Sequence, residues 1–234
     1  MKLDEKFWEY YFKDYDYLNE LFPYQELIHS LADSVEPRGK KILDVGCGTG
    51  NLAKILHEKG GIVTGLDYSS VGLSVYKNKI TDADVILHDI TKPLPFESNI
   101  FDAVVSSNTL YTIPRHVRQN IFAEFYRITK PNGIVAIANI ANGFSPMHIY
   151  LIHLYTAVKR NGILNTIGKV IKLFMPTIRI FHKNSLIKSE HHRGKYDFFL
   201  QGEQKEELIR VGFSKVSDDV RTYANQSILN VAIK

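Results

Sequence analysis

The stretch KILDVGCGTGNLA, residues 41–53, decides the fold of this 234-residue chain. Ile42 to Val45 are apolar and predict a buried strand, and the apolar residues after Asn51 recur at helical spacing. Three glycines join the two elements: Gly46, Gly48 and Gly50. Because glycine adopts positive φ and carries no Cβ, such a turn can expose backbone amides to a ligand. The stretch therefore predicts a small-molecule cradle at a helix N-terminus.

A dinucleotide site is the nearest alternative for this cradle, but its third glycine or alanine would fall one position later, where this chain has Asn51. Asp44 would also repel a pyrophosphate that helix amides are meant to attract. A ligand with a sulfonium and an ammonium group tolerates that carboxylate. The pattern D-x-G-x-G-x-G after an apolar strand thus resembles the first motif of class I methyltransferases that use S-adenosylmethionine. A glycine-rich turn without catalytic meaning is the remaining interpretation.

The resemblance implies an α/β fold with a doubly wound, mainly parallel sheet of seven strands and an antiparallel last strand. It also implies S-adenosyl-L-methionine as cofactor and S-adenosyl-L-homocysteine as product. In the first motif it assigns cofactor binding to four residues: Asp44, Gly46, Cys47 and Gly48. It covers residues 41–139 firmly and the C-terminal segment loosely.

Acidic residues follow the next two predicted strands. Asp67 ends the strand that starts at Ile62, where a nucleoside-binding α/β domain holds ribose hydroxyls. By resemblance Asp67 binds the ribose and Tyr68 packs near the adenine, although Ser69 would also allow Asp67 to be a simple turn residue. Asp89, after the strand 84–87, matches the third motif. There a carboxylate accepts from the adenine amino group and the next residue, Ile90, covers the ring.

The end of the fourth predicted strand, 101–106, falls beside the position of the transferred methyl group. The segment Ser106 to Tyr111 has neither Asn/Asp-Pro-Pro-Tyr/Phe nor Pro-Cys. This absence disfavours methylation of nucleobase or glutamine amide nitrogens and of cytosine carbon. Ser107 is predicted to contact the cofactor and Tyr111 the substrate. Many small-molecule members carry a histidine at the end of this motif, but this chain has Leu110 and Tyr111 there. A histidine base at this position is therefore not inherited from the family.

The composition is ordinary for a soluble globular protein, with 44% hydrophobic and 23% charged residues, and the length allows one α/β domain or one domain plus a lid. Cys47 is the single cysteine, so nothing requires an oxidising compartment, and it is expected to serve as a small turn residue. The first residues lack the features of a signal peptide, so a cytoplasmic location is expected. One domain, 1–234, is predicted with four parts: an aromatic cap, 1–38; a cofactor-binding core, 39–142; a lid, 143–202; and a C-terminal helix with two strands, 203–234.

The predicted cap is rich in aromatic residues between Asp4 and Phe22, which favour one amphipathic helix or two short ones ending before Pro23. They would either pack on the sheet edge or cover the active site, as segments before the first strand often do in the resembling family. Tyr11 and Tyr15, one helical turn apart, are the candidates for facing the cofactor or substrate.

The predicted lid, a helical insert after the fifth strand, is both basic and apolar. Residues 144–200 carry nine Lys/Arg against Glu190 and Asp197, a local net charge of +7, so the rest of the chain sums to −3. No segment approaches the roughly 20 apolar residues that cross a bilayer. Lysines that merely face water are one interpretation; an anionic substrate, a membrane-surface lipid or nucleic acid are the functional ones.

The predicted activity is in-line methyl transfer to a small, apolar or anionic metabolite. Tyr111, His148 and His153 are the candidates for a general base, which is needed only if the acceptor arrives protonated. No histidine spacing predicts a metal site. Two alternatives stay open: an RNA or protein methyltransferase that docks through the basic lid, with nucleic acid disfavoured, and a non-catalytic S-adenosylmethionine-binding module. Peripheral contact of the lid with a membrane surface is a further option.

Overall fold

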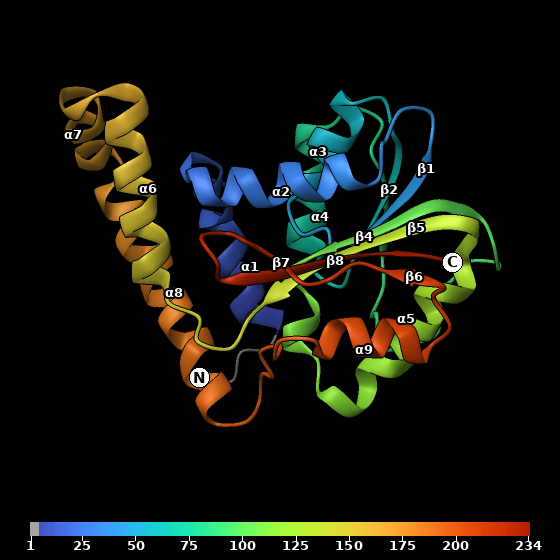
Figure 1. Ribbon diagram of the computed structural model, residues 1–234. Coiled ribbons are helices and arrows are strands. Elements are labelled where there is room, and N and C mark those ends of the chain that lie inside the picture. Colours follow the sequence, from blue (N-terminus) through green and yellow to red (C-terminus); the bar gives the residue numbers. More distant parts are fainter. Residues whose placement is uncertain (1–4) are drawn as a thin grey trace.

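The computed structural model describes residues 5–234, and its centre is a single mixed sheet (Figure 1). Residues 1–4 of the predicted cap lie outside the described residues. They include Asp4, where the aromatic segment was predicted to begin. The strands are β1 (Lys41–Val45), β2 (Ile62–Asp67), β3 (Asp84–Leu87), β4 (Phe101–Ser107), β5 (Thr129–Ile140), β6 (Lys215–Val216), β7 (Val220–Thr222) and β8 (Ser227–Ile233).

The strand order is β3-β2-β1-β4-β5-β8-β6, with β7 also paired to β8. Strands β1 to β5 are mutually parallel, and β8 is antiparallel to β5. The order reverses at β1, which lies between β2 and β4. Ligands of open α/β sheets bind outside the carboxyl ends of the strands at such a switch point. The predicted doubly wound sheet with an antiparallel last strand is confirmed.

The first of the two predicted C-terminal strands is broken into β6 and β7. Val216 pairs with Ala232 in β6 and Val220 pairs with Leu229 in β7, so the register against β8 shifts by one residue between them. Such a shift is a bulge, which bends a strand without removing it from the sheet. β6 and β7 therefore occupy one strand position, and the sheet has the predicted seven positions.

Helices cover both faces of the sheet and build an arm beside it (Figure 1). The α-helices are α1 (Glu5–Tyr15), α2 (Phe22–Ser34), α3 (Asn51–Glu58), α4 (Ser70–Lys79), α5 (Arg115–Ile128), α6 (Pro146–Asn161), α7 (Ile163–Lys172), α8 (Phe174–His192) and α9 (Glu203–Arg210). Two short 3-10 helices are η1 (Asp16–Glu20) and η2 (Leu110–Thr112). The helices α2 and α3 lie on one face, whereas α5 and α9 lie on the other.

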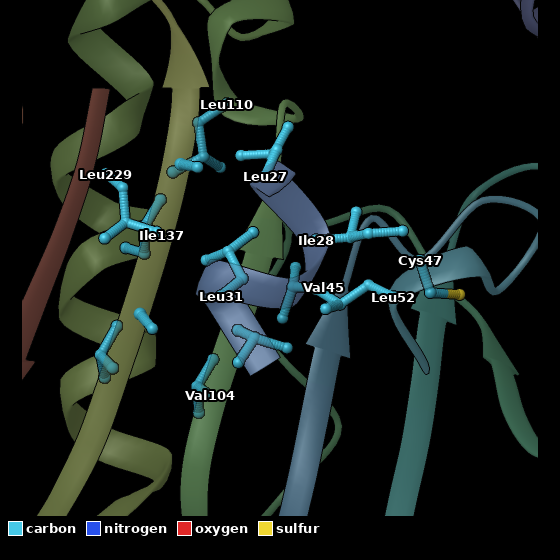
Figure 2. Close-up of a cluster of buried hydrophobic side chains, with 14 of the residues drawn as sticks. Leu27, Ile28, Leu31, Val45, Cys47, Leu52, Val104, Leu110, Ile137 and Leu229 are labelled. Carbon is cyan, nitrogen blue, oxygen red and sulfur yellow. The ribbon is translucent and has the colours of Figure 1, made fainter. Parts of the chain in front are cut away.

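The hydrophobic core forms where α2 packs on the sheet (Figure 2). Leu27 and Leu31 of α2 point toward the strands, where Val45, Val104 and Ile137 are fully buried. Burial of each such side chain stabilises the fold by roughly 1.5–3 kcal/mol. This packing fixes the carboxyl ends of β1 and β4, which carry the glycine turn and Ser107.

Two boundaries differ from the prediction. Pro23 was expected to end the aromatic segment, but α2 begins at Phe22 with Pro23 in its first turn, where proline needs no amide partner. The pair Asn132-Gly133, within residues 130–133, is a turn signal and predicts a turn before the apolar part of β5. It instead forms a bulge inside β5, with Asn132 at φ 63° and a register shift against β4. The Asn-Gly turn chemistry was correctly located, but the strand continues on both sides of it.

The predicted lid position is occupied by α6, α7 and α8, which follow β5 directly. α8 contacts α1, and α6 contacts α2, so the lid region and the N-terminal cap form one layer above the carboxyl ends of the strands. Within residues 5–234, no helix is long and apolar enough to cross a membrane.

Candidate active site

The glycine turn after β1 takes the conformation that its sequence requires. Gly46 and Gly48 have φ angles of 72° and 52°, in the left-handed region. A Cβ on Gly46 would clash with Thr109 Oγ1, and one on Gly48 would lie 2.9 Å from Phe12 Cε1. Glycine is therefore needed for backbone angle and for close approach. The ring of Phe12, in α1, covers the turn from above.

Asp67, at the end of β2, is buried and tied to the glycine turn. Its Oδ2 accepts a hydrogen bond from the Gly48 amide at 2.8 Å, and its Oδ1 accepts one from the Ser69 amide at 2.8 Å. Ser69 then caps α4 by accepting from the Gly72 amide. Asp67 is thus a turn residue, but each carboxylate oxygen can accept a second hydrogen bond. The two vicinal hydroxyls of a ribose fit that remaining capacity.

Asp44 is a buried acid with an unsatisfied oxygen. Its exposed fraction is 1%, and Oδ2 has no hydrogen-bond partner among the residues described. Burial and the nearby charge of Asp67, opposed by a hydrogen bond from the Ala53 amide, together raise the pKa of Asp44 to about 8. A buried, unpartnered polar atom is unfavourable, so this carboxyl is suited to a cationic ligand group. A ligand with an ammonium group fits it.

A cavity of about 410 Å³ lies at the carboxyl ends of the strands, a size typical of small-molecule sites, which span ~300–1,000 Å³. Ten of the predicted site residues line it: Tyr11, Tyr15, Gly46, Gly48, Asp67, Tyr68, Asp89, Ile90, Ser107 and Tyr111. Four others, in the part of the chain that the structure describes, do not: Asp44, Cys47, His148 and His153.

Asp89 and Ser107 bring further polar atoms to this cavity. The Thr91 amide and hydroxyl both donate to Asp89 Oδ1, so Oδ2 can accept from an adenine amino group. Ser107 Oγ is buried and has no partner within residues 5–234. These atoms lie at the ends of β3 and β4, on either side of the glycine turn. The polar positions of the cavity floor are therefore Asp67, Asp89 and Ser107, and Asp44 is buried just before the glycine turn.

Cys47 packs into the fold and not toward the cavity. A Cβ on Gly65 of β2 would lie 2.9 Å from Cys47 Sγ, so the thiol fills the space beside that glycine. Burial raises the pKa of the Cys47 thiol well above its ordinary value. A protonated, buried thiol is a poor nucleophile, in agreement with its expected role as a small turn residue.

Tyr111 is held in the cavity wall by a buried polar network. The amides of Leu110 and Tyr111 donate to Asn139 Oδ1 at 2.9 and 3.3 Å, and Asn139 Nδ2 donates to Gln204 Oε1 at 2.7 Å. Burial raises the pKa of Tyr111 well above its ordinary value. The hydroxyl stays protonated at neutral pH and can donate a hydrogen bond to an acceptor. This geometry favours Tyr111 as a positioning donor over a phenolate base.

The two histidine candidates lie elsewhere. His148 is exposed on the first turn of α6, where its amide donates to the capping Ser145 Oγ. His153 lines a second, smaller cavity, and its Nδ1 accepts from the Phe22 amide at 3.3 Å. Burial lowers the pKa of His153, so its ring is neutral at pH 7. The geometry gives neither histidine access to the large cavity.

The roof of the cavity joins α1 to α8, a contact that sequence reasoning missed. Tyr11 donates its hydroxyl hydrogen to Asn184 Oδ1 at 2.8 Å. One turn on, Asp14 accepts from Lys183 Nζ at 2.7 Å and pairs with Arg179. Asn184, Tyr196 and Tyr223 also line the cavity. These residues lie far from the motifs in sequence. The only sequence signal for such a roof was the abundance of aromatic residues in the predicted cap.

The described residues contain no group of three or more His, Cys, Asp or Glu side chains that could hold a metal ion.

A family model described as a methyltransferase domain matches residues 43–137, from β1 to β5. Residues 43–137 thus match a methyltransferase domain, and the strand order is that of the class I fold. S-adenosylmethionine is the cofactor of this class, so the family and the cofactor predicted from the first motif are confirmed. The unpartnered oxygens of Asp44 and Ser107, together with the acids at Asp67 and Asp89, suit that cofactor.

Curated relatives of this methyltransferase domain act on different molecules. The chain is 36% identical over 106 residues to a demethylmenaquinone methyltransferase of Listeria monocytogenes, covering 42% of this chain and 44% of the relative. It is 39% identical over 102 residues to a malonyl-[acyl-carrier protein] O-methyltransferase of Buchnera aphidicola, covering 44% of this chain and 40% of the relative. The chain thus spans less than half the length of these relatives.

Solved structures resemble the chain over almost its whole length. An S-adenosylmethionine-dependent methyltransferase from Mesorhizobium loti superimposes with a TM-score of 0.59 at 18% identity, covering 88% of this chain and 96% of that one. A methyltransferase from Aquifex aeolicus gives a TM-score of 0.59 at 15% identity, covering 92% and 91%. At such identities the likeness shows the fold.

Proposed function

We propose that this protein transfers the methyl group of S-adenosylmethionine to a small-molecule acceptor that is largely apolar. The observation that carries the proposal is the division of one cavity into two parts. Its floor has the glycine turn and the polar atoms of Asp67, Asp89 and Ser107. Its other walls are mostly aromatic and aliphatic: Trp8, Phe12, Tyr24, Ile113, Phe144, Ile187, Tyr196 and Tyr223.

The floor supports cofactor binding by charge and by hydrogen-bond capacity. Asp67 would hold the ribose, Asp89 the adenine amino group, and Asp44 would neutralise the ammonium group at the turn. Tyr68 and Ile90 bring flat and apolar surface to the base. When bound there, the cofactor supplies an electrophilic methyl group on a sulfonium. The residues of the turn fix the direction from which an acceptor must approach.

The roof supports catalysis by positioning and by excluding water. Well-oriented reactants can lower a barrier by ~7 to 11 kcal/mol, so alignment alone can provide most of the acceleration. Tyr111 would donate a hydrogen bond to the acceptor, and the aromatic walls would keep water from the reacting atoms. Lys195 brings a positive charge to the wall, although it already pairs with Glu190 at 3.4 Å. An acceptor with an acidic group would be compatible with it.

Calorimetric titration of the full chain with S-adenosylmethionine and S-adenosylhomocysteine tests the cofactor site. Incubation with methyl-labelled cofactor and a metabolite extract then tests the acceptor. We expect saturable binding and label in one or a few small molecules. Binding without consumption of label in any extract would instead favour a non-catalytic cofactor-binding module. Label in RNA or protein would favour the macromolecular alternative, for which the basic lid is the docking face.

A further inference from the structure

Exposed apolar side chains gather on the α6–α8 arm. Among residues 5–234, 20 large hydrophobic side chains are exposed, and 12 of them lie between Met147 and Ile178. Figure 1 shows α7 at the far end of this arm, away from the sheet. Single exposed hydrophobic residues are ordinary, but a concentration on one projecting element marks an interaction surface.

The orientation of α7 makes this concentration specific. Ile163, Leu164, Ile167 and Ile171 recur at helical spacing and are all exposed, with 85% of Leu164 accessible. Thr166, on the other side of the helix, is only 5% exposed. A helix that only covers a cavity would turn its apolar face inward and its polar face to water. In α7 these four apolar residues face outward instead, while Asn165 and Lys172 are also exposed and the half-buried Val170 lines the second cavity.

The positive charge of the same arm indicates an anionic partner. Residues 144–189 contain seven Lys/Arg and no Asp or Glu. Lys159 and Arg160 in the last turn of α6 and Lys172 of α7 are exposed, Arg160 lies over the Phe22 ring at 4.8 Å, and Lys169 pairs with Glu20 of η1 at 3.7 Å. The surface that covers this arm must therefore be both apolar and anionic.

We propose that the docking surface, formed by α7 with the last turns of α6 and the first turns of α8, binds an anionic phospholipid bilayer. α7 lies in the plane of the interface, with its isoleucines and leucine at the boundary of headgroups and acyl chains and its lysines at the phosphates. Nucleic acid would satisfy the lysines but leave these aliphatic side chains in water, because bases are bound by hydrogen bonds and aromatic stacking.

A second cavity of about 50 Å³ lies inside the arm, and its wall includes residues of α6, α7 and α8. Leu18, Asn184 and Tyr223 line this cavity and the large one. The second cavity is therefore adjacent to the large one and is lined in part by α7, so under the proposed function an acceptor dissolved in the bilayer would enter from this side. This consequence for the acceptor rests on the proposed function, whereas membrane docking does not.

Flotation of the full chain with vesicles tests the docking. We expect binding to vesicles of phosphatidylcholine mixed with phosphatidylglycerol, much weaker binding to phosphatidylcholine alone, and a decrease with added salt. The double variant Leu164→Asp with Ile171→Asp should lose binding to both vesicles, while the matched control Ile209→Asp, an exposed residue of α9, should not. Lys159→Gln and Lys172→Gln should each weaken anionic binding about fivefold, and Lys92→Gln should have no effect.

Three results would overturn the proposal. The first is equal vesicle binding by the wild type and by Leu164→Asp with Ile171→Asp. The second is a dimer in sedimentation velocity that dissociates in that variant, which would make the face an interface between copies. The third is salt-sensitive RNA binding through Lys159 and Lys172 without vesicle binding. Calorimetry with S-adenosylmethionine on the same variants separates these failures from failure of the proposed function, because none of these residues lies in the cavity wall.

Discussion

The floor and the roof of the large cavity are built in different ways. The floor comes from short segments at the ends of β1, β2, β3 and β4, where each side chain is placed by the strand just before it. The roof depends on contacts between residues far apart in the chain: Tyr11 bonds to Asn184, 173 positions away. Its ion pair, Asp14 with Lys183, spans 169 positions. The floor is thus positioned by the sheet, and the roof by how α1 and α8 meet.

Asp67→Ala should give the largest effect of all, a loss of cofactor affinity that arises at the floor of the cavity. It removes two acceptors for the ribose, and hydrogen bonds to charged groups contribute ~1.5–3 kcal/mol each, so S-adenosylmethionine binding should weaken about 100-fold or more. Calorimetry measures the loss. Asp84→Ala is the matched control, since Asp84 accepts from Thr64 Oγ1 at the start of β3. Unchanged binding in Asp67→Ala would contradict the assigned floor.

Lys183→Met should disrupt the roof and leave the floor intact. Lys183 is fully buried, and removing one partner of a buried ion pair lowers the free energy of unfolding by ~3–5 kcal/mol. Chemical denaturation measures this change, with Lys188→Met, an exposed residue of α8, as control. Adding Asp14→Leu should restore part of the loss. If cofactor affinity fell as much as in Asp67→Ala, floor and roof would not be separable.

The roof pair also predicts a dependence of stability on pH. Burial alone would raise the pKa of Asp14, but hydrogen bonds from Lys183 and Arg179 outweigh it and hold that pKa below its ordinary value. The stability from this pair is therefore present above the ordinary aspartate pKa and is lost as pH falls through the lowered pKa. Lys183→Met should flatten this acid loss in thermal melts.

Asp44→Asn should change cofactor affinity and stability in opposite directions. Binding of the ammonium group should weaken by about 1.5–3 kcal/mol, because a charged acceptor is lost. The folded-state pKa of Asp44 is raised to about 8, so its contribution to stability is complete below the unfolded pKa near 4 and is lost as pH rises through about 8. Without cofactor, the variant should match the wild type at pH 4 and melt higher at pH 8.

Calorimetry in several buffers tests independently whether Asp44 contacts the cationic group of the cofactor. Because the carboxyl is protonated at pH 7, binding of a cation there should release protons, and the observed heat should depend on the ionisation enthalpy of the buffer. The dependence should disappear in Asp44→Asn. A wild-type heat that is the same in all buffers would show that Asp44 does not meet the cationic group.

Tyr11→Phe should give the smallest effect, on the contact between α1 and α8. Loss of its hydrogen bond to Asn184 should lower the free energy of unfolding by about 1 kcal/mol. A double-mutant cycle with Asn184→Ala measures the coupling between the two side chains. Tyr17→Phe, on the more exposed η1, is the matched control. A coupling near zero would mean that the roof is held by packing and the Asp14 pair alone.

The sequence by itself determined the sheet, the glycine turn and most of the floor. Motif residues such as Gly46, Asp67 and Asp89 stand next to the strands that place them, so local pattern and spacing contain their geometry. The bulge in β5 and the break between β6 and β7 were not predicted, because strand pairing is decided by the partner strand as well as by the local turn.

Only the tertiary structure decided the roof and the direction of α7. A helical period shows that α7 has an apolar and a polar side, but the same period results whichever side meets the protein. Asn184, Lys183 and Tyr223 carry no local signal for a cavity, because their neighbours in space come from the opposite end of the chain. Long-range packing is the sum of many contacts between distant segments. A single sequence gives the residues but does not show which of them meet.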